Sequence, residues 1–227
     1  MARVTMAATR EGRTLVHWTL VIPVKSLARA KSRLSDAAGD GLRPGLALAF
    51  AQDTVAAALI CPAVRDVAVV TDDALAGREL AALGARIVTD EPSGGLNAAL
   101  AHGAATVRSE RPEIPVAALN ADLPALRPPE LARVLEAAGE FPRAFLPDAA
   151  AIGTTLLAAA PGRELLPAFG TDSRARHRAS GAVELSVGGV DSVRQDVDTG
   201  DDLRAALALG VGPRTAAATA RLLIPGQ

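Results

Sequence analysis

The feature that most constrains the fold is an alternation of short apolar runs with longer helical patterns over the first 140 residues. Four apolar runs predict strands, and each is followed by a segment whose apolar residues have helical spacing. The predicted strands are 19–24, 66–73, 85–90 and 115–122, and the predicted helices are 44–60, 74–84, 95–109 and 128–139. This alternation predicts an α/β domain with a mainly parallel sheet and helices on both faces.

The second half of the chain is less regular. Segments 143–148 and 153–160 predict neighbouring strands, with antiparallel pairing as one option, and a short polar helix, a strand and a last helix are predicted over 171–180, 182–187 and 199–210. Thr199 and Asp202 have the spacing of a capping box at the start of that last helix. Residues 18–212 are therefore predicted to form a single domain, with a flexible tail over 1–17 and a second tail over 213–227.

Composition excludes several classes of function. The net charge is -1, whereas a broad electrostatic grip on nucleic acid needs a large basic surface. No stretch approaches the roughly 20 uninterrupted apolar residues of a membrane span, and residues 1–17 lack the apolar core of a signal peptide. The single cysteine, Cys61, cannot form a disulfide within the chain or a zinc cluster, so a buried inert thiol is expected. These features predict a cytoplasmic protein that binds neither nucleic acid nor membrane.

Polar residues follow all four predicted strands of the first half. Lys25 and Lys31, the only lysines of the chain, follow the first strand, and an ammonium group reaches phosphate oxygens as a point charge. At the ends of the next three strands, or just after them, come Asp72, then Gly95 with Asn97, then Asp122. Helix caps and turns explain each of these alone. Because ligands of an open parallel sheet bind beyond the carboxyl ends of its strands, their joint placement predicts a nucleotide site.

The kind of nucleotide site is narrowed by the motifs that are missing. There is no G-x-G-x-x-G after the first strand, and no G-x-x-x-x-G-K-[ST]. Instead, Asp122 lies in "NADLP" and a late acidic segment, "RQDVDTGDD", contains Asp196 and Asp198. Alone, either late aspartate is more simply a loop or cap residue. Paired with Asp122 across the sheet edge, one of them would suit Mg²⁺, which takes one or two carboxylates and keeps its other ligands for water and phosphate.

The ordered set of motifs resembles a known family. In sequence order these are "VIPVKSLARAKSRLSD", "VVTDD", "GLNAAL", "LNADLP", "GTTLL", "FGTDSRARH" and "VRQDVDTGDDL". The set resembles the guanylyltransferases of coenzyme F-420 biosynthesis, called CofC, or FbiD in actinobacteria. The similarity runs from about Trp18 to Leu209. It implies the single-domain, Rossmann-like fold of nucleotide-diphospho-sugar transferases, a group that includes the MobA-like molybdenum-cofactor guanylyltransferases.

The activity implied by the resemblance is transfer of GMP from GTP to the phosphate of a three-carbon acid, with release of pyrophosphate. The acid would be phosphoenolpyruvate, which gives enolpyruvyl-diphospho-5'-guanosine, or alternatively 2-phospho-L-lactate or 3-phosphoglycerate. The composition, rich in alanine and arginine and poor in lysine, favours the actinobacterial branch and its phosphoenolpyruvate. An enzyme that consumes the unstable guanylylated product is the implied protein partner.

Positions that match the family's motifs also imply roles for residues. Lys25 and Lys31 would hold the GTP phosphates, with Asp72, Gly95 and Asn97 also on the nucleotide side. Asp122 and Asp196 would bind Mg²⁺ and, with Lys31, form the catalytic set. Thr155, Gly170 and Ser173 would bind the acid, with His177 beside them. Ser173 and the amides after it are expected to open a helix N-terminus toward a carboxylate or phosphate.

Two other readings stay open at this point. A molybdenum-cofactor or sugar-phosphate nucleotidyltransferase is disfavoured because the first loop reads Pro23-Val24-Lys25, where those relatives typically carry a glycine-rich loop with an arginine. A non-catalytic nucleotide-binding module with a decayed site is disfavoured because both lysines and both aspartates are present.

Overall fold

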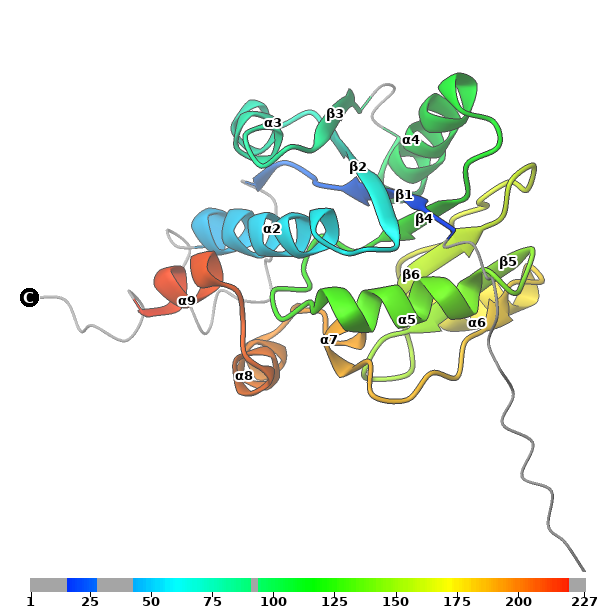
Figure 1. The fold of residues 1–227 in the computed structure, drawn as a ribbon. Helices are drawn as coiled ribbons and strands as arrows, with labels where there is room; N and C mark the ends of the chain where they lie inside the picture. The colour runs from blue at the N-terminus through cyan, green and yellow to red at the C-terminus, as the bar shows by residue number, and fades with distance from the viewer. Residues whose placement is uncertain (1–15, 28–42, 91–93, 221–227) are drawn as a thin grey trace, which may run out of the picture.

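A computed structural model of the chain describes residues 16–27, 43–90 and 94–220. In this part of the chain one sheet has seven strands in the order β3-β2-β1-β4-β6-β5-β7 (Figure 1). The strands are β1 (Trp18–Pro23), β2 (Val64–Thr71), β3 (Arg86–Thr89), β4 (Val116–Leu119), β5 (Arg143–Pro147), β6 (Thr154–Ala159) and β7 (Val183–Glu184). Neighbouring strands are parallel except that β6 runs antiparallel to β4 and β5. The predicted mainly parallel sheet is confirmed.

Helices cover both faces of this sheet, as predicted. They are α2 (Arg43–Leu59), α3 (Ala74–Ala81), α4 (Leu96–Glu110), α5 (Pro128–Ala138), α6 (Ser173–Ala179), α7 (Asp191–Arg194), α8 (Gly200–Leu209) and α9 (Pro213–Ala220). One buried apolar cluster joins one face of the sheet to α2, α3 and α5, and a second joins the other face to α4 and the segment before α6. The described residues form a single α/β domain around these two clusters.

The central strands are apolar along their whole length because they are covered on both faces. All six residues of β1 and all four of β4 are buried. Strands buried in this way read as continuous hydrophobic runs rather than alternating ones. This explains why the sequence pattern located them well.

The strand order reverses at β1, and this reversal creates the position for a ligand. The chain passes from β1 to β2 and β3 on one side, and then crosses to β4 on the other side of β1. Loops that leave the carboxyl ends of β1 and β4 therefore run in opposite directions and leave a crevice between them.

The C-terminal part differs from the sequence-based expectation in three respects. Strand pairing over 182–187 is limited to β7, and the short helix α7 was not predicted. The helix over Gly200–Leu209 has the predicted capping box but is not the last one, because residues 213–220 of the expected tail form α9 beside α2 (Figure 1). The buried carboxylate of Asp53 on α2 accepts the backbone N–H groups of Arg214 (3.2 Å) and Thr215 (2.7 Å). A contact between such distant segments leaves no local sequence signal.

Two further observations concern cysteine and membranes. The Cys61 thiol is buried, and desolvation by burial raises its pKa, so the group stays protonated and unreactive at neutral pH.

Among the described helices, none combines the length and the apolar character that a bilayer crossing requires.

Candidate functional site

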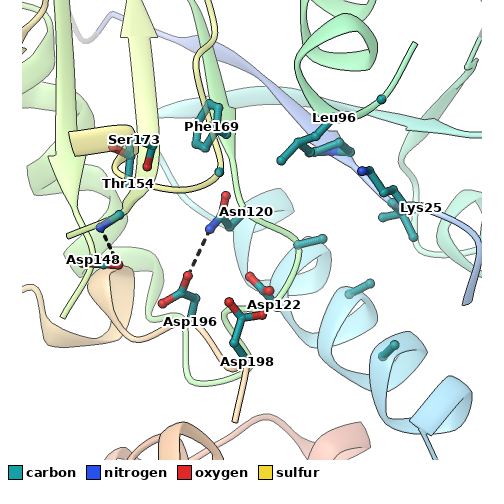
Figure 2. Close-up of a pocket in the computed structure, with 18 of the residues that line it drawn as sticks. Lys25, Leu96, Asn120, Asp122, Asp148, Thr154, Phe169, Ser173, Asp196 and Asp198 are labelled. Carbon is teal, nitrogen blue, oxygen red and sulfur yellow. Dashed lines mark hydrogen bonds between the residues drawn. The ribbon is translucent and has the colours of Figure 1, made fainter. Parts of the chain in front are cut away.

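A cavity of about 960 Å³ lies at the carboxyl ends of β1 and β4. Its walls come from the loops after β1, β2, β3 and β4, the start of α4, and segments 148–154, 169–173 and 196–198. Figure 2 shows Lys25 and Leu96 on one side, Thr154 and Ser173 on the other, and a group of aspartates between them. The cavity therefore lies at the carboxyl ends of the strands, where the predicted nucleotide site was expected, and at the position where the strand order reverses.

Asp122 and Asp196 come from distant segments and meet in this cavity. The backbone N–H of Val197 donates to the carbonyl oxygen of Asp122 at 3.0 Å, which ties the two segments together. The Nδ2 of Asn120 donates to Oδ2 of Asp196 at 3.3 Å (Figure 2). Asp198, the alternative to Asp196 in the sequence analysis, also lines the cavity. The structure thus brings together the carboxylates that the sequence pattern paired.

Asp73 holds the start of the loop after β1. The Oδ2 of Asp73 accepts the backbone N–H of Leu27 at 2.9 Å, while its Oδ1 caps the start of α3. The hydrogen bond from Leu27 is the main reason that the pKa of Asp73 is lowered. Lys25 and Asp72 both line the cavity, as predicted. Lys31 lies outside the described residues.

The two residues predicted at the start of α4 have different positions. Gly95 lines the cavity and precedes α4 with a φ of 93°, in the region that favours glycine. Asn97 is not among the lining residues. Its Oδ1 accepts the backbone N–H of Phe169 at 2.7 Å, and its Nδ2 donates to the Phe169 carbonyl at 3.1 Å.

On the opposite wall, a bulge in β6 changes which threonine faces the cavity. Leu146 pairs with Leu156, but the next residue of β5, Pro147, pairs with Thr154, so Thr155 is the extra residue on β6. A bulge of this kind re-aims the neighbouring side chains. Thr154 lines the cavity, whereas the predicted Thr155 does not, and its buried Oγ1 has no hydrogen-bond partner in the described part of the chain.

The segment 168–173, hereafter the 168–173 loop, contains the predicted Gly170 and Ser173, and both line the cavity. Gly170 has a φ of 109°, which a residue with a Cβ adopts only with strain. The backbone N–H groups of Ser173 and Arg174 already donate to the carbonyls of Gly170 and Ile152. The expectation of an open helix N-terminus is therefore wrong at the first amide after Ser173, while the Ser173 residue itself lines the cavity.

His177 is fully buried behind this loop and connects it to β6. The Ala168 N–H donates to Nε2 at 2.9 Å, so that nitrogen carries no proton and Nδ1–H must donate to Thr154 Oγ1, 3.0 Å away. The hydroxyl proton of Thr154 is then not used in this contact, and Thr154 itself lines the cavity. The rings of Phe145 and Phe169 pack against the imidazole. Burial, together with the charges of Arg143 and Arg176, lowers the pKa of His177 to about 4.

A neutral buried His177 predicts that stability depends on pH. Below its ordinary pKa of 6.5 the unfolded imidazole binds a proton that the folded protein excludes until about pH 4. Stability from this group should therefore be complete above pH 6.5 and fall as pH decreases toward 4, by up to ~3 kcal/mol. Urea denaturation at pH 7 and pH 5 measures the difference. Between pH 7 and pH 5, His177→Gln should lose less stability than wild type. The control His102→Gln should lose as much stability as wild type. Equal losses in wild type and His177→Gln would contradict the prediction.

The described part of the cavity wall is strongly acidic. Seven aspartates line it against a single lysine, Lys25. The aspartates are Asp72, Asp90, Asp122, Asp148, Asp172, Asp196 and Asp198. An anionic ligand entering this wall is repelled unless further cations accompany it. In the described residues, no three histidine, cysteine, aspartate or glutamate side chains form a group able to hold a metal by themselves. A cation here would need ligands from the bound molecule as well.

Comparison with known proteins identifies close relatives. Residues 18–217 match the family described as "Guanylyl transferase CofC like". A protein of Streptomyces avermitilis named phosphoenolpyruvate guanylyltransferase is 87% identical over 211 residues, which cover 93% of this chain and 98% of the relative. The corresponding protein of Streptomyces coelicolor is 83% identical over 212 residues, covering 93% of this chain and all of the relative.

The fold is also shared with solved structures, a nucleotidyl transferase among them. A nucleotidyl transferase from Methanothermobacter thermautotrophicus superposes with a TM-score of 0.58 at 20% identity, over 85% of this chain and 97% of the other. The Rv0371C protein of Mycobacterium tuberculosis H37Rv, solved in complex with manganese, gives a TM-score of 0.55 at 23% identity, over 86% of this chain and all of the other. At this level of identity the likeness concerns the fold. The predicted nucleotidyltransferase fold is confirmed.

Proposed function

The chain belongs to the family of CofC-like guanylyl transferases, and on this premise we propose that it transfers GMP from GTP to the phosphate of phosphoenolpyruvate. The products are enolpyruvyl-diphospho-5'-guanosine and pyrophosphate, as a step of coenzyme F-420 biosynthesis. One observation carries the proposal: a single cavity holds the carboxylates of Asp122 and Asp196. Lys25 lies on one side of them, and the wall that contains Thr154 and Ser173 lies on the other. The name of the relatives that are more than 80% identical supports phosphoenolpyruvate as the acceptor.

The nucleotide occupies the side formed by the loops after β1 and β2 and by the start of α4. Lys25 neutralises charge on the triphosphate there, and Asp72 and Gly95 form the neighbouring wall. Lys31 is proposed as a second phosphate ligand and catalytic cation on the basis of its motif alone. An ammonium group suits this role because its three donors rotate freely toward phosphate oxygens.

Asp122 and Asp196 fit a bound Mg²⁺. Both are hard oxygen donors, and Mg²⁺ commonly takes only one or two carboxylates while substrate phosphates and water complete its shell. The acidic wall around Lys25 gives a second reason, because GTP would otherwise meet net repulsion. When bound, the ion supplies neutralisation of phosphate charge. Asp122 and Asp196 provide its place, and the hydrogen bond from Asn120 orients the Asp196 carboxylate.

The chemistry requires positioning and charge neutralisation. An oxygen of the acceptor phosphate attacks the α-phosphorus, a new P–O bond forms, and the bond between the α-phosphorus and the bridging oxygen breaks as pyrophosphate leaves. The attacking oxygen is already anionic, so no side chain has to remove a proton or form a covalent intermediate. Holding the two phosphates in line is the main contribution of the protein.

The acceptor occupies the opposite side of the cavity. Thr154, whose hydroxyl proton is directed away from His177, donates to the acid there, and Ser173 supplies a second hydroxyl. Gly170 lets the backbone approach the acid closely. Thr155, the residue implied by the motif, does not line the cavity, and Thr154 takes its role in this proposal.

Two wider consequences belong to this proposal. GTP and phosphoenolpyruvate are metabolites of the cytoplasm, which is where we place the reaction. The product is a mixed diphosphate of an enol, so an enzyme that consumes it directly would limit its loss by hydrolysis, and we propose such an enzyme as a partner.

Pyrophosphate release tests the function. We expect release from GTP and Mg²⁺ with phosphoenolpyruvate, and moderately slower release with 2-phospho-L-lactate or 3-phosphoglycerate, each offered separately. Faster release with one of the other acids would move the assignment to that acid. Tight binding of GTP without release in the presence of any acid would instead support a nucleotide-binding module.

A further inference from the structure

The carboxamide of Asn97 is committed to the backbone of the 168–173 loop. Its oxygen and its nitrogen bond to the N–H and the carbonyl of the same residue, Phe169, at 2.7 and 3.1 Å. The pair of hydrogen bonds resembles the pair that joins two residues of neighbouring strands, except that the Asn97 side-chain amide takes the place of one backbone. Asn97 itself is the second residue of α4, directly after Leu96, which lines the cavity.

We propose that Asn97 is a positioning residue that holds the 168–173 loop in place for the acceptor, and that it does not bind the nucleotide. The inference rests on the proposed function. It differs from the role that the family resemblance implied for this residue. Both polar atoms of the side chain are engaged with Phe169, and the residue is not part of the cavity wall.

The loop depends on side chains for its shape because its first residues make few regular backbone contacts. The Ala168 N–H donates to His177 from α6, while both polar groups of Phe169 bond to Asn97 from α4. Arg176 adds a second donor to the Phe169 carbonyl at 3.1 Å. The loop is thus held from two helices, and among the described residues Asn97 reaches it from α4, whose start forms part of the nucleotide side of the cavity.

Loss of this contact should affect one substrate more than the other. Phe169 directly precedes Gly170, and Ser173 follows three residues later, so a shift of the Phe169 backbone displaces the groups proposed to bind the acid. A displacement of about 1 Å in a substrate-positioning element can cost roughly 100-fold in rate. Lys25, Asp72 and Gly95 do not depend on this loop, so the affinity for GTP should stay unchanged.

The test is the variant Asn97→Ala, which removes both hydrogen bonds while keeping a good helix former in α4. We expect the KM for phosphoenolpyruvate to rise by about 10-fold or more, as the loss of one to two net hydrogen bonds implies. The KM for GTP should stay within about 2-fold of the wild-type value, because no hydrogen bond to the nucleotide is removed. Titration calorimetry with Mg²⁺-GTP and with phosphoenolpyruvate, each added alone, measures the two affinities without turnover. The affinity for phosphoenolpyruvate should fall, and that for GTP should stay unchanged.

Ser109→Ala is the matched control, because it removes one exposed side-chain hydrogen bond from the other end of α4 and should leave both KM values unchanged. A rise in the KM for GTP alone would overturn the inference and return Asn97 to the nucleotide site. An equal rise in both values, together with a lowered Tm, would overturn it in favour of a purely structural role. Failure of the proposed function would be visible in wild type, as the absence of pyrophosphate release, and so cannot be confused with these outcomes.

Discussion

Replacing Asp196 with asparagine should lower the kcat of GMP transfer by about 10²- to 10³-fold, because the variant would hold the charge-neutralising Mg²⁺ less firmly and the loss of one such stabilising contact in a transition state usually costs this much. The variant keeps the shape of the side chain and removes the charge opposite Asp122. Because the two carboxylates repel each other, the fold should be no less stable than wild type. Initial rates under saturating GTP and phosphoenolpyruvate, together with Tm, measure the two effects separately.

The dependence on Mg²⁺ distinguishes a metal ligand from other roles. In Asp196→Asn the Mg²⁺ concentration at half-maximal rate should rise, and the same should hold for Asp122→Asn. Asp201→Asn is the control, since that carboxylate is 83% exposed at the start of α8 and outside the cavity wall. It should behave as wild type in both measurements. Full activity of Asp196→Asn with an unchanged Mg²⁺ requirement would show that the assignment of Asp196 to the metal is wrong.

The sequence predicted the placement of Asp122 because it depends on topology, whereas Asp196 was predicted from the late acidic segment and the family resemblance. Asp122 follows a strand that is buried on both faces, and such strands are visible as uninterrupted apolar runs. Once the strands are parallel, their carboxyl ends must meet at one edge, so a polar residue after each strand is placed without knowing any side-chain contact. The same reasoning placed Lys25, Asp72 and Gly95 in the wall of the cavity.

Features that depend on a single extra residue or on distant contacts could not be predicted. The bulge in β6 exchanges Thr155 for Thr154 at the cavity, and no residue type marks it, since both positions are threonine. Asn97 bonds to Phe169, and Asp53 to Thr215, across long separations in the chain. Asp73 had a partial signal, because an aspartate directly before a helix is a typical N-cap. Its second contact, to Leu27, depends on how the first loop folds back.

The close approach of α4 to the sheet leads to the largest expected effect on stability. A Cβ built on Gly103 would lie 2.5 Å from Cγ2 of Val70 and 2.7 Å from Cγ1 of Val21, shorter than real contacts allow. Both valines belong to central strands and are almost completely buried, so neither can move aside. Gly103→Val should therefore destabilise the protein by about 3 kcal/mol or more through overpacking. For a chain of this length that corresponds to a Tm lower by roughly 6–12 °C.

Gly45→Val provides the same chemical change without the contact. Gly45 lies in α2, and no atom of the described residues lies within 4 Å of its Cβ position, so its replacement should change stability by less than about 0.5 kcal/mol. Thermal unfolding of the two variants beside wild type separates packing from helix propensity; equal Tm values for the two would show that α4 is not in close contact with the sheet.

The same close contact sets the depth at which α4 presents Asn97 to Phe169. The fraction of Gly103→Val that remains folded at 25 °C should therefore also bind phosphoenolpyruvate more weakly than wild type, while Gly45→Val should not.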